Sequence, residues 1–173
     1  MICVSIGRTR HKHVIAEHKH LVEQGAELVE LRLDYIGRAV NLKRLLADRP
    51  CPVVITCRRQ EDGGRWAGTE EARQVLLRTA IAEGVEYIDL EEDIADLIPR
   101  FGKTKRIISH HDFSGTPADL GKLHERMLGL DPDIVKIATM ANSPIDCLRM
   151  MKLTKESPVP TIGLCMGEIG TPT

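Results

Sequence analysis

In the heptapeptide LVELRLD, residues 28–34, apolar and charged side chains alternate from Val29 to Asp34. Successive side chains of a β-strand point to opposite faces of the sheet, so Val29, Leu31 and Leu33 share one face while Glu30, Arg32 and Asp34 share the other. A parallel strand covered by helices on both faces is apolar on both. This segment is therefore predicted to be a strand with one face against helices and one face lined with charged groups.

Short apolar runs recur along the chain and alternate with segments of helical periodicity. Besides residues 28–34, the apolar runs are 2–6, 52–58, 86–91, 106–113, 133–139 and 161–167. The helical segments between them are 11–25, 41–49, 69–84, 93–102, 116–130 and 143–157. End signals accompany several of these helices: Thr69 at a start, Gly25 and Gly84 at ends, and Pro117 and Pro144 in first turns. The alternation predicts βαβ units and a parallel sheet.

Side-chain parity separates the two parallel architectures. The charged residues Asp89, Glu91 and Lys136 also lie on one face of their strands, opposite the apolar residues. An open doubly wound sheet is apolar on both faces, whereas a barrel with a ligand site at the carboxyl ends of its strands has this asymmetry. The first strand is also not followed by the glycine-rich turn G-x-G-x-x-G.

We therefore predict an α/β protein with the (β/α)8 TIM barrel fold. The prediction is a single domain over residues 1–173, truncated after its seventh strand, because a complete barrel typically needs about 250 residues. Strand eight and the last helices are expected to be absent.

Composition excludes several classes of protein. Hydrophobic residues make up 42% of the chain, charged residues 28%, and the net charge is −1, which is typical of a soluble globular domain. Basic residues do not alternate with aromatic ones, so we expect no nucleic-acid partner, and no apolar run is long enough for a membrane span. The five cysteines include no C-x-x-C pair, which favours reduced thiols in the cytoplasm. The histidines of residues 10–20 are interleaved with Lys and Arg, which favours a solvated helix face over a metal site.

Lys136 is the candidate nucleophile. Its parity directs it into the barrel, and lysine is rarely buried without a functional or structural partner. A partly desolvated lysine among other cations is deprotonated more easily, and the free amine attacks a carbonyl to form a Schiff base. In SHHDF (residues 109–113), His111 shares the parity of Ser109 and is the candidate proton carrier, while His110 is expected to face the helices.

The segment TCRRQEDGG, residues 56–64, follows the third predicted strand. Arg58 has the planar fork that suits a carboxylate or a polyol. Glu61 and Asp62 lie in the loop itself, where acidic residues are most often simply solvated.

Taken together and in order, five segments of the chain resemble the type I 3-dehydroquinate dehydratase family. They are ELRLD (30–34), TCRR with the following DGG (56–64), SHHDF (109–113), VKIA (135–138) and MGEIGTPT (166–173). The resemblance implies a (β/α)8 barrel that forms a homodimer and uses neither metal nor cofactor. It implies the dehydration of 3-dehydroquinate to 3-dehydroshikimate in the shikimate pathway, within aromatic amino acid biosynthesis.

The resemblance also implies roles for individual residues. Lys136 matches the lysine that forms an imine with the C3 ketone, and His111 matches the histidine that takes a C2 proton and later assists loss of water. Four further positions match residues that hold the substrate hydroxyl and carboxylate groups: Ser5, Glu30, Arg32 and Arg58.

Two features depart from the family pattern. Asp62 occupies the position of a glutamate that positions the histidine, and because aspartate is one methylene shorter we expect it to reach His111 only through water. The family's carboxylate-binding arginine and its closing loop follow strand seven, and these positions lie beyond Thr173.

Two other functions stay open on the sequence. A class I aldolase also uses an imine lysine on the sixth strand of a barrel, although the polar second strand and SHHDF favour the dehydratase. An incomplete barrel would alternatively act as an assembly subunit, because unpaired strand edges pair readily with other chains.

Overall fold

The structure, a computed structural model, describes residues 2–173. The chain divides into two compact units. The first contains the chain up to Asp89 together with Arg100–Thr104, and the second contains Leu90–Pro99 and Lys105–Thr173. The single domain expected over residues 1–173 stays a prediction.

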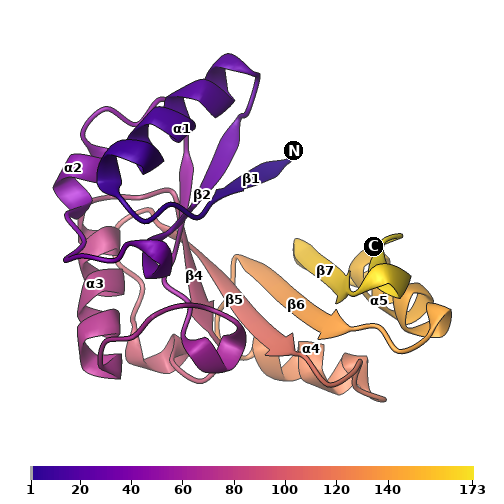
Figure 1. Cartoon of the computed structure of the whole chain (residues 1–173). Coiled ribbons are helices and arrows are strands. Elements are labelled where there is room, and N and C mark those ends of the chain that lie inside the picture. The colour runs from indigo at the N-terminus through magenta and orange to yellow at the C-terminus, as the bar shows by residue number, and fades with distance from the viewer. Residues whose placement is uncertain (1) are drawn as a thin grey trace. The chain divides into compact units, whose positions relative to one another are not determined.

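The first unit consists of parallel strands with three α-helices on one side of them (Figure 1). Strand β1 pairs with β2, β2 with β3, and β3 with β4. The strands are β1 (Cys3–Ile6), β2 (Leu28–Arg32), β3 (Val53–Thr56) and β4 (Tyr87–Glu91), the last of which continues into the second unit. The helices are α1 (His11–Glu23), α2 (Leu42–Leu46) and α3 (Glu70–Ala82). Two 3-10 turns follow β2 and β3: η1 (Leu33–Tyr35) and η2 (Gln60–Asp62).

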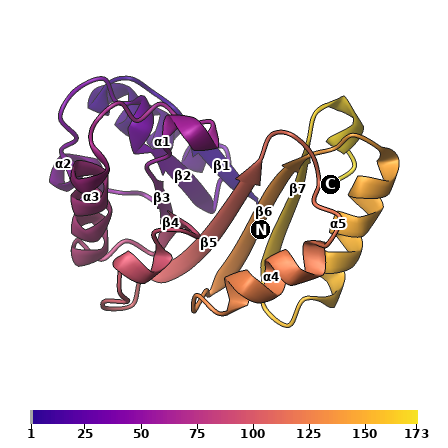
Figure 2. The same cartoon turned by 90° about the horizontal axis from the view of Figure 1, so that it is seen from below.

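The second unit has the same parallel organisation, with α4 and α5 side by side against its strands (Figure 2). Strand β6 lies between β5 and β7. The elements are β5 (Lys105–Asp112), α4 (Leu120–Leu128), β6 (Ile134–Met140), α5 (Pro144–Glu156) and β7 (Thr161–Met166), with 3-10 turns η3 (Ala95–Leu97) and η4 (Glu168–Gly170).

The strand order is the chain order, β1 to β7. A doubly wound sheet reverses its strand order at a switch point, whereas a (β/α) barrel adds each strand next to the previous one. The predicted α/β class and the barrel type of strand succession are therefore confirmed for these seven strands.

The apolar core follows the parity expected from the sequence. In β2, Val29 and Leu31 are fully buried, whereas Glu30 and Arg32 are half-buried. Burial of each large aliphatic side chain contributes about 1.5–3 kcal/mol, so this apolar face holds the strand against its helices. The charged face of the strand is left available for a site.

Most of the predicted helix ends are confirmed. The Thr69 hydroxyl accepts a hydrogen bond from the amide of Ala72, and Gly25 and Gly84 have positive φ values of 98° and 72° directly after α1 and α3. Pro144 is the first residue of α5, where its missing N–H costs nothing.

Two helix predictions are wrong. Residues 93–102 contain only η3, because Pro99 lacks the N–H that a continuing helix needs. Pro117 lies outside α4, which starts at Leu120 because the Asp119 carboxylate accepts a hydrogen bond from the amide of Lys122 and caps the helix there. Across residues 2–173, no helix is both long enough and apolar enough to cross a membrane.

Candidate active site

The charged face of the first unit begins with Ser5 and Glu30. Ser5 of β1 is in register with Glu30 of β2, and Glu30 is in register with Val54 of β3, so all three lie on one face of the sheet. The Glu30 carboxylate accepts a hydrogen bond of 2.6 Å from the hydroxyl of Thr56, which fixes the direction of the glutamate. Ser5 is exposed.

Arg32, one layer further along β2, is held by a carboxylate. Its Nε and Nη2 donate to the two oxygens of Asp34 at 2.9 and 2.8 Å. Burial alone would lower the pKa of Arg32, but the hydrogen bonds and charge of Asp34, helped by Glu30, outweigh it, and the pKa is raised. The guanidinium also lies 4.9 Å from the ring centre of Tyr35. Arg32 is thus a permanently charged group with a fixed orientation.

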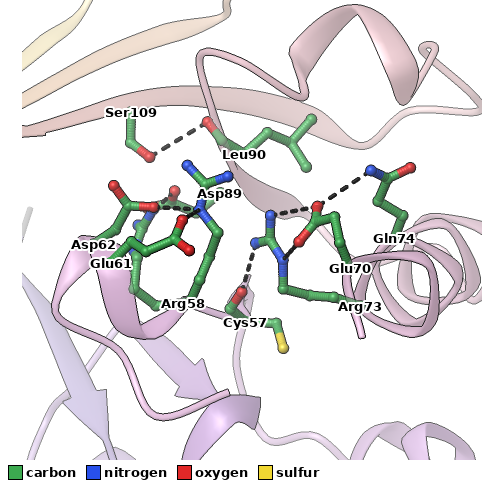
Figure 3. Close-up of polar contacts among 11 residues, drawn as sticks. Cys57, Arg58, Glu61, Asp62, Glu70, Arg73, Gln74, Asp89, Leu90 and Ser109 are labelled. Atoms are coloured by element: carbon green, nitrogen blue, oxygen red, sulfur yellow. Dashed lines mark hydrogen bonds and ion pairs between the residues drawn. The ribbon is translucent and has the colours of Figure 1, made fainter. Parts of the chain in front are cut away.

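Arg58 follows β3 and forms a buried ion pair. Its Nη2 donates to the Asp89 carboxylate at 2.7 Å, and the two side chains are 4% and 1% exposed (Figure 3). A buried ion pair adds little net stability, but it fixes the orientation of both side chains.

The loop after Arg58 turns sharply and brings Asp62 back to Arg59. The Arg59 Nε donates to the Asp62 carboxylate at 2.6 Å, and Gly63 adopts the left-handed conformation with φ 74°. At Gly64, an added Cβ would lie 2.0 Å from the carbonyl oxygen of Arg58, so only glycine fits. Asp62 and His111 belong to different units, and their expected water-mediated contact stays a prediction.

Lys136 and His111 lie in the second unit. Lys136 of β6 is in register with Ser109 of β5, and His111 is in register with Ala138. Because alternate residues share a face, Lys136 and His111 lie on the same face of the sheet, with the histidine one layer nearer the carboxyl ends of the strands. Both side chains are half-buried.

His110 points to the opposite face, as the sequence predicts. Its Nδ1 lies 2.7 Å from the Glu92 carboxylate, which also accepts hydrogen bonds from Arg126 of α4. The hydrogen bond with His110 is the main cause of the lowered pKa of Glu92, and Arg126 lowers it further against the opposing effect of burial. The neighbouring histidines therefore have different surroundings: His110 contacts Glu92, which is bonded to Arg126 of α4, and His111 lies on the other face.

Three residues hold the charged side chains in place, and the sequence did not indicate these pairings. Thr56 holds Glu30, Asp34 holds Arg32, and Asp89 holds Arg58. Parity was the available signal for Thr56 and Asp89, because both follow the charged-face alternation of their strands. Asp34 was assigned to the strand, but it lies in the turn η1, which directs its carboxylate back to Arg32.

The site contains no preformed metal cage. Within residues 2–173, no three side chains of His, Cys, Asp or Glu are grouped so that they could hold a metal ion.

Comparison with known proteins adds the family. The family model of type I 3-dehydroquinase matches residues 2–173. The 3-dehydroquinate dehydratase of Desulfotalea psychrophila is 34% identical over 182 residues, which cover 98% of this chain and 79% of the relative. That of Methanopyrus kandleri is 37% identical over 150 residues, covering 83% and 69%. The bifunctional 3-dehydroquinate dehydratase/shikimate dehydrogenase of Arabidopsis thaliana is 36% identical, and the chain spans 30% of its length.

Solved structures agree with this assignment. The crystal structure of 3-dehydroquinate dehydratase from Geobacillus kaustophilus superposes with a TM-score of 0.86 at 25% identity, covering 99% of this chain and 75% of that one. The type I enzyme from Clostridium difficile gives the same TM-score at 26% identity, covering 97% and 76%. The chain therefore belongs to the type I 3-dehydroquinase family.

Proposed function

We propose that this chain eliminates water from 3-dehydroquinate to give 3-dehydroshikimate through an imine on Lys136. Family membership over residues 2–173 supports the reaction. The observation that carries the proposal is the register of β5 with β6, which puts Lys136 and His111 on one face of the sheet.

The reaction begins with attack of the neutral Lys136 amine on the C3 ketone. Loss of water from the carbinolamine gives an iminium, which accepts electrons better than the ketone does and so acidifies the adjacent C–H bond. The His111 imidazole takes the C2 proton, and the electron pair left on C2 forms the new double bond as the β-hydroxyl departs. The same imidazole, now protonated, gives its proton to the leaving hydroxyl, and water then hydrolyses the imine to release the product and the amine.

The first unit supplies the substrate-binding groups in this proposal. Arg32 and Arg58 bind the carboxylate and hydroxyl oxygens of the substrate, and Glu30 and Ser5 bind hydroxyl groups. Each arginine is already oriented by a carboxylate in the structure, so binding substrate costs little side-chain ordering. Asp62 is proposed to orient His111.

A homodimer in a reducing compartment such as the cytoplasm completes the proposal. All five cysteines are free thiols, and Cys57, Cys147 and Cys165 are buried, which supports a reducing compartment. Light scattering of the purified chain tests the dimer, with twice the mass of 19.3 kDa as the expected result.

Borohydride trapping separates the proposed reaction from its alternatives. The protein is incubated with 3-dehydroquinate, reduced with borohydride, digested and analysed by mass spectrometry. Ligand mass on the Lys136 peptide supports the dehydratase, whereas trapping with a phosphosugar and not with 3-dehydroquinate would identify an aldolase. Failure to trap either compound would leave the assembly role. Lys122→Ala, a change at an exposed lysine on α4, is the control and should not alter trapping.

A further inference from the structure

The first turn of α3 contains a completely buried arginine. Arg73 is 0% exposed, and its Nε and Nη2 each donate to one oxygen of Glu70 at 2.8 Å. Its Nη1 donates to the backbone carbonyl of Cys57 at 2.8 Å. Figure 3 shows the guanidinium between these two partners. Taking an arginine out of water has a large desolvation cost, which the hydrogen bonds to Glu70 and Cys57 offset.

The carbonyl that Arg73 holds belongs to the peptide bond leading into Arg58. Cys57 is itself buried, and Arg58 directs its side chain to Asp89. Because a planar guanidinium donates in fixed directions, the contact fixes the plane of this peptide and with it the backbone from which Arg58 projects. Helix α3 thus fixes the backbone position of Arg58, whose guanidinium group is proposed to bind substrate.

The Glu70 carboxylate holds the Arg73 guanidinium in place. Besides Arg73, it accepts a hydrogen bond of 3.2 Å from Gln74 of the same helix. Burial raises the pKa of Glu70, but the hydrogen bonds from Arg73 and Gln74 and the charges of Arg73 and Arg59 outweigh it, and the pKa is lowered. The carboxylate is therefore ionised at neutral pH, as an ion pair with Arg73 requires.

We propose that the Glu70–Arg73 pair is a positioning device for Arg58 and thereby sets the affinity for the substrate. The inference rests on the proposed function, because it assumes that Arg58 binds 3-dehydroquinate. Neither Glu70 nor Arg73 contacts the reacting atoms in this scheme. Weakening the pair therefore raises KM and leaves the chemical step at Lys136 unchanged.

Glu70→Gln is the decisive variant, and Glu71→Gln is its matched control. Both remove one negative charge from the first turn of the same helix, so the effect on the helix dipole is shared. Glu71 is exposed, whereas Glu70 receives the hydrogen bonds of Arg73. Steady-state kinetics with 3-dehydroquinate should show KM raised about tenfold in Glu70→Gln, with kcat within about twofold of the parent, and no change in Glu71→Gln.

Arg73→Lys provides a second variant, because lysine keeps the charge and loses the fork. It should raise KM in the same way, and borohydride trapping at saturating substrate should be as complete as in the parent. Urea unfolding of each variant verifies that the assays use folded protein.

The possible outcomes separate the two proposals. Equal KM values for Glu70→Gln and Glu71→Gln would overturn the inference, as would a fall in kcat as large as the rise in KM. Neither result overturns the proposed dehydratase function, which is measured on the parent chain. If the parent chain neither turns over 3-dehydroquinate nor forms a trapped imine, the proposed function fails, and this inference fails with it.

Discussion

His111 and Lys136 lie on the same face of neighbouring strands, with His111 one layer closer to the carboxyl ends. The adjacent His110 lies on the opposite face, where it meets Glu92. Two adjacent histidines of the chain therefore lie on opposite faces of β5, one on the face of Lys136 and the other beside Glu92. This difference makes the two histidines a natural pair for mutagenesis.

His111→Gln should lower kcat about 10²–10⁴-fold, because the proton transfers lose their carrier. The amine of Lys136 is unaffected, so borohydride should still trap the imine. His110→Gln should keep kcat within about threefold and cost about 1 kcal/mol of stability through the lost Glu92 contact. A variant of His110 that loses as much kcat as His111→Gln would contradict these assignments. Steady-state absorbance assays measure kcat, and urea unfolding measures stability.

Breaking the buried ion pair of Arg58 and Asp89 should destabilise the fold more than breaking an exposed ion pair. Asp89→Ala leaves a buried guanidinium without its carboxylate and should lower the free energy of unfolding by about 3 kcal/mol. Glu156→Ala removes one partner of the exposed pair with Lys152 and should change it by less than about 0.5 kcal/mol. Equal effects in urea titrations would show that Asp89 does not stabilise the buried cation.

Gly64→Ala should disturb the turn that carries Asp62. The new methyl group would lie 2.0 Å from the Arg58 carbonyl oxygen, so the backbone must move. We expect KM to rise at least about fivefold, since a small displacement of a binding group has a large kinetic effect. Gly37→Ala is the control, because nothing lies within 4 Å of the added atom. Unchanged KM in Gly64→Ala would mean that the loop does not position the binding residues.

The lowered pKa of Glu92 predicts that the stability of the fold depends on pH. Its pKa is lower in the folded chain than the ordinary value of 4.5, chiefly through His110, so its contribution is complete above that value and is lost as the pH falls through the folded pKa. The difference in unfolding free energy between the parent and Glu92→Gln should therefore be constant from about pH 7 to about pH 5 and shrink at lower pH. Urea titrations across this range measure it. A difference that stays constant down to about pH 3 would contradict the assignment.

The strands, and which side chains share a face of each strand, were predictable from the sequence, because the side chains of a strand alternate with a period of two. Lys136, His111, Glu30 and Arg32 lie on the faces that parity assigns to them. The same rule placed His110 against the helices.

What could not be predicted depends on contacts between distant residues or on turn geometry. The partner of Arg58 is Asp89, which is 31 residues away, and no local pattern links them. Arg73 lies within the helical segment 69–84, and helical periodicity alone does not indicate that its side chain holds the carbonyl of Cys57. The segment 93–102 has helical periodicity, yet Pro99 prevents the helix, so periodicity alone gave the wrong element there.

The proposed reaction requires that the Lys136 amine capture the substrate ketone. Reduction with borohydride in the presence of 3-dehydroquinate, followed by peptide mass spectrometry, measures this directly. We predict one added ligand on the peptide that contains Lys136, and none in Lys136→Met. Ligand on a different lysine, or turnover that persists in Lys136→Met, would contradict it.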